Sequence, residues 1–185
     1  ALPVKLRAIE NCRKGGIKSI VLVQTLAKGL NDDQIGPMIK FATSNTDVIR
    51  GINVQPISFS GRVDLEERQE KRITIPDFMQ LVETQTDGAI TKDDFYPVPF
   101  VLPISHLVER WHGEPGVEFT VHPHCGAATY IFVEGDHYIP ITRFLDVEGL
   151  MELFEEEATH VHGLGGRLRT VKDLLEKIPQ FVDQE

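Results

Sequence analysis

The stretch GINVQPISFSGR, residues 51–62, decides the fold when it is read together with VLVQTLAKGLNDDQIG at residues 21–36. Residues 17–24 are an apolar, β-branched run of the kind found in parallel strands buried on both faces. The pattern predicts a helix between this run and a second strand at residues 50–59. Two strands joined by a right-handed helical crossover indicate a parallel sheet or a segment of a parallel α/β barrel.

A further amphipathic helix is predicted at residues 1–16, where apolar side chains recur at helical spacing and Gly15 or Gly16 ends the run. Cys12 lies on its apolar stripe, so we expect a core thiol there. The helix after the first strand has Asn31 as its expected N-cap. Because the chain begins on a packing helix with no initiator Met, we expect it to be part of a longer protein.

The composition changes abruptly at residues 63–72, VDLEERQEKR, which are dense in charge and read as a solvated linker or surface helix. We place the domain boundary there, with one domain over residues 1–66 and a second, α+β domain over residues 67–185. The second begins with a helix expected after Thr74, because Thr74 and Asp77 occupy capping positions.

The prolines of residues 93–105 favour an extended connection without a regular helix. Alternating apolar residues predict a strand at 117–121. A β-hairpin is expected next, with strands at residues 128–133 and 137–142 and a turn at Glu134, Gly135 and Asp136. Two helices are expected after it, at residues 146–159 and 170–178, the second capped by Thr170.

The charge balance restricts the classes of partner. With 19 basic and 28 acidic residues the net charge is −9, which argues against a general nucleic-acid binder. No apolar run is long enough to span a bilayer, so any membrane contact is expected to be peripheral, and the composition is typical of a cytoplasmic protein. Two cysteines at unrelated positions cannot form a disulfide framework and suit a reducing compartment.

Four stretches carry a resemblance to a known family: residues 21–42, 51–62, 72–100 and HPHCGAATYIFV at 122–133. Together they resemble the C-terminal half of radical S-adenosylmethionine (SAM) iron–sulfur oxidoreductases, in the branch that includes tetraether lipid synthases and pterin-methylating enzymes. The resemblance implies a partial parallel (β/α) barrel, SAM and a 4Fe–4S cluster. The CxxxCxxC motif that holds this cluster in the family is absent from the chain, so its ligands are expected in a missing N-terminal half.

In such a barrel the ligands lie at the carboxyl ends of the strands. By analogy we predict that Gln24, Thr25, Gln55, Ser58 and Arg62 contact the cofactor or the substrate. Amide and hydroxyl groups can form neutral hydrogen bonds, and a guanidinium can hold a carboxylate or phosphate. The alternative is that Gln55 closes a layer of the barrel and that Arg62 pairs with a nearby acid.

HPHCG, residues 122–126, is a second candidate site, because a thiolate and imidazoles are suitable ligands for zinc or iron. We predict Cys125 as one ligand of an auxiliary cluster, with a buried structural thiol or a reactive group as alternatives. His106 and His112 are interpreted as surface or packing residues. GLGG at residues 163–166 lacks the spacing of a dinucleotide site and is interpreted as a helix terminus.

The resemblance thus predicts a fragment of an enzyme in which a 5′-deoxyadenosyl radical abstracts hydrogen from an unactivated carbon, for lipid coupling or pterin methylation. The substrate is a small molecule or a lipid. A fragment of this kind is expected to be inactive alone, and its incomplete sheet to expose an apolar face. The rival interpretations are a zinc-binding domain and a module that completes a partner's barrel.

Overall fold

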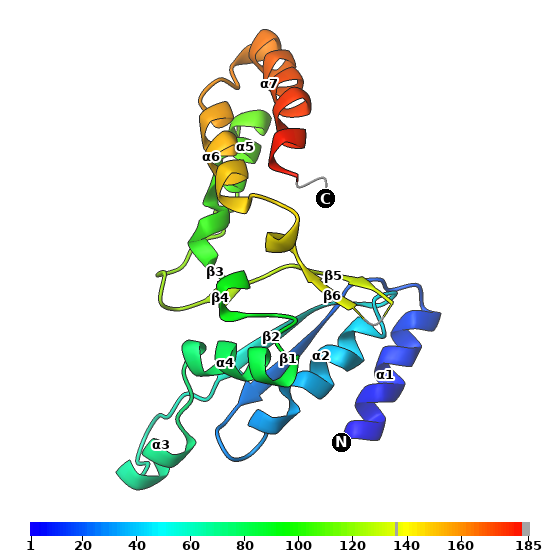
Figure 1. Cartoon of the computed structure of the whole chain (residues 1–185), viewed down its shortest axis with the longest axis vertical. Coiled ribbons are helices and arrows are strands. Elements are labelled where there is room, and N and C mark those ends of the chain that lie inside the picture. The colour runs from blue at the N-terminus through cyan, green and yellow to red at the C-terminus, as the bar shows by residue number, and fades with distance from the viewer. Residues whose placement is uncertain (136, 183–185) are drawn as a thin grey trace. The chain divides into compact units, whose positions relative to one another are not determined.

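The computed structural model describes residues 1–135 and 137–182 (Figure 1). The chain divides into two compact units, Ala1–Lys92 and Asp93–Glu185. The two units meet after Lys92, later than the domain boundary predicted at residues 66/67 from the charged stretch. The predicted boundary marks the expected end of the barrel segment and stays a prediction. Asp136, predicted in a hairpin turn, lies outside the described residues.

The first unit alternates helices and strands in the predicted order. Its elements are α1 (Leu2–Lys14), β1 (Ile20–Leu26), the 3₁₀ turn η1 (Asp32–Gln34), α2 (Ile35–Thr43), β2 (Ile49–Pro56), α3 (Leu65–Lys71) and α4 (Ile75–Gln85). β1 and β2 pair in parallel, which confirms the predicted parallel sheet. The two strands form a sheet by themselves in the described residues, and no closed barrel is formed.

Helices α1 and α2 cover one face of this sheet. Ala42, Val48 and Ile49 form the buried centre, and the partly buried side chains around it are Ile9, Cys12, Ile20, Leu22, Phe41 and Ile52. Cys12 packs in this core as predicted. The opposite face is bare, since Val21 and Val23 are 53% and 61% exposed. The prediction that the first strand is buried on both faces is therefore wrong for this unit, while the expected exposed apolar face is present.

The start of α4 follows the capping rule. The Thr74 hydroxyl accepts a hydrogen bond from the Asp77 amide, and the Asp77 carboxylate accepts one from the Thr74 amide. The start of α2 differs from the prediction. Asn31 forms no side-chain cap; its side chain instead bonds the amide of Ala27 and the carbonyl of Thr25, which ties the end of β1 to the turn before the helix.

The second unit contains short strands followed by a helical group. Its elements are β3 (Tyr96–Pro97), η3 (Val98–Val101), α5 (Leu102–His112), β4 (Ala127–Ala128), β5 (Ile131–Glu134), β6 (His137–Pro140), η4 (Ile141–Arg143), α6 (Val147–Ala158), α7 (Gly163–Lys177) and η5 (Ile178–Phe181); η2 (Lys92–Asp94) joins the two units. β5 and β6 pair antiparallel, which confirms the predicted hairpin. α6 and α7 pack around Leu150, Met151 and Leu153.

Three predictions for this unit are wrong. The segment at residues 93–105 is not wholly extended, because α5 begins at Leu102 with Pro103 in its first turn, where proline is tolerated. The alternating residues 117–121 form no strand. The last helix begins at Gly163, and Thr170 is a fully buried residue within it instead of a cap. No helix of the described residues is long and apolar enough to cross a membrane.

Candidate functional site

The bare face of the parallel sheet brings two of the predicted ligand-contacting residues together. Thr25 lies opposite Gln55 in the register of β1 and β2, and both residues are exposed. Gln24 lies opposite Val54. Because successive side chains of a strand point to opposite faces, Gln24 points toward the helix-covered side. Its amide oxygen is buried there and has no hydrogen-bond partner among the described residues.

β1 ends two residues later than predicted, whereas β2 ends three residues earlier. β1 continues to Leu26, so Gln24 and Thr25 lie within the strand instead of after it. β2 ends at Pro56, so Gln55 is its penultimate residue, and Ser58 and Arg62 follow in an exposed loop. The structure therefore divides the five predicted residues into three on the strands, of which Gln24 faces away from the other two, and two in the loop.

Arg62 follows a left-handed turn at Gly61, whose φ is 77°. The predicted alternative was an ion pair with Asp64 or Glu66. No such ion pair is present in the part of the chain that the structure describes. The exposed guanidinium is free to hold an anionic group of a ligand. Its assignment to a ligand stays a prediction.

Sequence reasoning missed Asn53. It lies on β2 two positions before Gln55, opposite Val23, and is exposed on the same bare face. The signal that could have identified it is the two-residue period of a strand, counted back from Gln55. With Thr25, these residues make the carboxyl end of the bare face polar, whereas Val21 and Val23 contribute apolar surface from β1.

This face can offer both hydrogen-bond donors and acceptors without a net charge. Two side-chain amides and one hydroxyl are contributed by Asn53, Gln55 and Thr25. Ligands of parallel α/β sheets bind near the carboxyl ends of the strands, which is where these groups lie. The arrangement suits a neutral, polar heterocycle or sugar better than a fully charged group.

The environment of Cys125 is that of an exposed turn. Its backbone amide donates to the His122 carbonyl at 2.8 Å, and the rings of His122 and His124 meet edge to face with centroids 5.1 Å apart. The described residues contain no group of three or more His, Cys, Asp or Glu side chains placed to hold a metal. A ligand role for Cys125 stays a prediction that needs donors from elsewhere.

Gly126 has a packing role in the second unit. A Cβ atom at this position would lie 3.0 Å from a methyl group of Val98, in the segment that leads into α5. The amide of Val98 also donates to the Gly126 carbonyl at 3.1 Å. The glycine thus lets the HPHCG turn lie against this segment.

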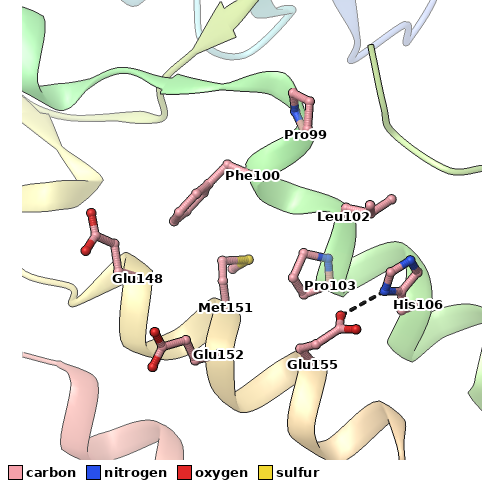
Figure 2. Close-up of a pocket in the computed structure, with 9 residues that line it drawn as sticks. All are labelled: Pro99, Phe100, Leu102, Pro103, His106, Glu148, Met151, Glu152 and Glu155. Carbon is pink, nitrogen blue, oxygen red and sulfur yellow. Dashed lines mark hydrogen bonds and ion pairs between the residues drawn. The ribbon is translucent and has the colours of Figure 1, made fainter. Parts of the chain in front are cut away.

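A hollow between α5 and α6 was not predicted from the sequence (Figure 2). Its volume is about 540 Å³. Phe100 and Met151 belong to its apolar floor, and carboxylates of α6 line its rim. His106 points across it, with Nδ1 2.8 Å from a carboxylate oxygen of Glu155. His106 is thus a partly exposed residue in an ion-pair position, in agreement with its interpretation as a surface or packing residue.

The described structure is that of a mixed α/β protein with one parallel pair, two antiparallel pairs and polar groups at the carboxyl end of a bare sheet face. No known protein family profile matches the chain. The chain is 50% identical, over 186 residues, to 7,8-dihydro-6-hydroxymethylpterin dimethyltransferase of Methanocaldococcus jannaschii. The match covers 98% of this chain and 36% of that relative, so the chain spans little more than a third of the relative's length.

Proposed function

We propose that the chain is part of a radical SAM enzyme that methylates a pterin, and that the bare face of β1 and β2 lines the pocket for its ligands. The observation that carries the proposal is the placement of Thr25 opposite Gln55 at the carboxyl end of an uncovered parallel pair. The name of the relative supports pterin methylation over lipid coupling, the other reaction suggested by the resemblance.

In this proposal residues 1–66 belong to the barrel and residues 67–185 are an extension specific to this branch. The rest of the enzyme covers the bare sheet face, which explains why Val21 and Val23 are exposed in the unit by itself. The length of the relative supports a larger parent, since the match covers 36% of it. Burial of such apolar surface would stabilise the assembled enzyme.

The described residues do not fit a complete ligand set for a 4Fe–4S cluster, because no group of three suitable side chains converges in them. The proposed cluster and its bound SAM therefore depend on cysteines elsewhere in the enzyme. When bound, the 4Fe–4S cluster and SAM would supply the radical chemistry. The residues of this chain bind and orient: Thr25, Asn53 and Gln55 would hold a neutral ring edge, and Arg62 an anionic group.

The proposal is tested by assaying the complete enzyme with SAM and 7,8-dihydro-6-hydroxymethylpterin. We expect methylated pterin as product, and a loss of catalytic efficiency of about tenfold to a hundredfold in Gln55→Ala, the cost of a lost ligand hydrogen bond in a buried site. Gln80→Ala, on the exposed surface of α4, is the matched control and should leave the rate unchanged. Absence of methylation of any pterin by the complete enzyme would reject the proposal.

A further inference from the structure

The last residues of β1 expose backbone groups at the edge of the sheet that β2 does not cover. Among the described residues, β1 pairs with β2 on one edge only. The Leu26 carbonyl accepts a hydrogen bond from the Ile57 amide at 2.8 Å, so the backbone of Leu26 points toward β2. Because successive residues of a strand direct their N–H and C=O groups to opposite edges, the backbone groups of Thr25 and Ala27 point to the free edge.

The side-chain amide of Asn31 bonds both of these groups. Its Nδ2 donates to the Thr25 carbonyl at 2.9 Å, and its Oδ1 accepts from the Ala27 amide at 3.0 Å. A residue of a further parallel strand would bond the same two groups, one on each side of Leu26. The Asn31 side chain therefore takes the place of such a strand at the carboxyl end of β1.

The turn that carries Asn31 is itself held in place. Gly29 adopts a left-handed conformation, with φ 70°, and its amide donates to the Asp32 carboxylate at 2.9 Å. The Asp32 carbonyl accepts a hydrogen bond from the side chain of Gln85, which lies on α4, at 2.6 Å. The turn is thus fixed to β1 on one side and to α4 on the other, which is the kind of support that keeps a site in one geometry.

We propose that Asn31 is a positioning residue of the proposed ligand site, and that its two hydrogen bonds keep the Thr25 hydroxyl on the bare face of the sheet. The side chain of a strand residue stands roughly perpendicular to the sheet in which its carbonyl lies, so holding the Thr25 carbonyl fixes the direction of the Thr25 side chain. Asn31 itself does not contact the ligand. The inference rests on the proposed function, because Asn31 has this role only if Thr25 contacts a ligand.

Asn45 offers a matched control at the other end of the sheet. Its Nδ2 donates to the Phe41 carbonyl at 2.8 Å, and its Oδ1 accepts from the Arg13 guanidinium at 2.7 Å. Asn45 precedes β2, so it lies toward the amino ends of the two parallel strands, away from the proposed site. Removing either asparagine side chain should lower the stability of the unit, but only the loss of Asn31 should alter ligand binding.

The test is a double-mutant cycle in the complete enzyme, measured by steady-state kinetics with SAM and the pterin. We expect Thr25→Ala and Asn31→Ala each to raise the KM for the same substrate about fivefold to tenfold, with kcat little changed. The double variant should be no worse than about tenfold, because Asn31 acts through Thr25, whereas independent effects would multiply to about 25-fold to 100-fold. Asn45→Ala should leave the KM within about twofold of the parent value.

Asn31→Asp separates the two hydrogen bonds. A carboxylate can still accept from the Ala27 amide, but it cannot donate to the Thr25 carbonyl. Hydrogen exchange of the Ala27 amide, read by mass spectrometry of overlapping peptides, should therefore stay slow in Asn31→Asp and become fast in Asn31→Ala. Both variants should share the raised KM. A parent-like KM in Asn31→Asp would show that Asn31 only supports the turn, which would overturn the inference.

The outcomes distinguish this inference from the proposed function. A KM unchanged by Asn31→Ala, or effects that multiply in the double variant, would overturn the positioning role and leave Thr25 in the site. A KM unchanged by Thr25→Ala would remove Thr25 from the site, and the inference with it. Calorimetry of SAM and of the pterin on the same variants gives the cycle as ligand affinities, so the positioning role is also decided if the enzyme does not methylate the pterin.

Discussion

Thr25 and Gln55 lie opposite each other in the parallel register of β1 and β2, on the sheet face that α1 and α2 leave uncovered. One residue earlier, Gln24 lies opposite Val54 and points toward the helices. Adjacent residues of one strand therefore have different roles in the proposed enzyme. Thr25 belongs to the ligand-facing side, and Gln24 belongs to the wall behind it.

The two neighbours should respond differently to substitution. Thr25→Ala is expected to raise the KM of the complete enzyme for its pterin or SAM about fivefold to tenfold, the cost of one neutral hydrogen bond, with little effect on stability. Gln24→Leu should leave the KM unchanged and keep or increase the stability, because the buried amide oxygen has no partner among the described residues. Steady-state kinetics and thermal unfolding of both variants distinguish the roles. Equal kinetic defects would contradict the assignment of faces.

Arg62 is predicted to bind an anionic group of the ligand. In the complete enzyme, Arg62→Ala should weaken ligand binding about tenfold or more, because a charge-assisted pair is lost, and Arg62→Lys should recover part of the affinity. Binding is measured by calorimetry for SAM and for the pterin separately. Arg7→Ala, an exposed arginine on α1, is the control. Unchanged affinity for both ligands would remove Arg62 from the site.

The contact of α2 with α4 depends on a glycine. A Cβ atom on Gly36 would lie 2.7 Å from the carbonyl oxygen of Gln85, and the Gly36 amide donates to the Gln85 side chain at 2.9 Å. Gly36→Ala should therefore lower the free energy of local unfolding by about 1–3 kcal/mol through overpacking. Hydrogen exchange of the α2 and α4 amides measures this change. Gly165→Ala on α7, where no atom lies within 4 Å of the new Cβ, should not lower it.

The cap of α4 is predicted to be sensitive to acid. Asp77 accepts hydrogen bonds from the amide and the hydroxyl of Thr74, at 2.9 and 2.6 Å, and these bonds lower the pKa of the Asp77 carboxyl. Because the folded pKa lies below the unfolded one, the stabilisation is present above the ordinary pKa and is lost as the pH falls through the lowered value.

Thr74→Ala should accordingly reduce helix stability by about 1 kcal/mol at neutral pH, and Thr74→Ser should preserve it. The stability difference between the parent and Asp77→Asn should shrink as the pH falls toward 2. Hydrogen exchange of the first-turn amides of α4 at several pH values measures both effects. A difference that grows on acidification would contradict the cap.

The parallel order of the first unit could be predicted because the crossover rule leaves few topologies for a strand–helix–strand sequence. The faces of the strands could not. The apolar run at residues 17–24 indicated a strand buried on both faces, so the sequence offered no alternation that would distinguish a covered face from a bare one. For this reason Gln24 and Thr25 were grouped together, and Asn53 was overlooked.

The elements of the second unit were harder to predict because its apolar side chains pack against residues that are distant in the sequence. Pro103 occurs in the first turn of α5, where proline has no cost, so a proline-rich segment did not exclude a helix. The glycines at residues 163–166 were interpreted as a helix terminus, but the last helix was predicted to begin only at Thr170, whereas α7 begins at Gly163. The hollow between α5 and α6 is formed by two helices whose contact with each other no local sequence pattern predicts.

The most direct test of the central claim is thiol labelling of Asn53→Cys in the complete enzyme, read by peptide mass spectrometry, with Gln80→Cys as the exposed control. If the bare face of β1 and β2 lines the ligand pocket, Cys at position 53 should react much more slowly than Cys at position 80. It should be protected further by SAM and the pterin together. Labelling at position 53 as fast as at position 80, and unaffected by both ligands, would contradict the account.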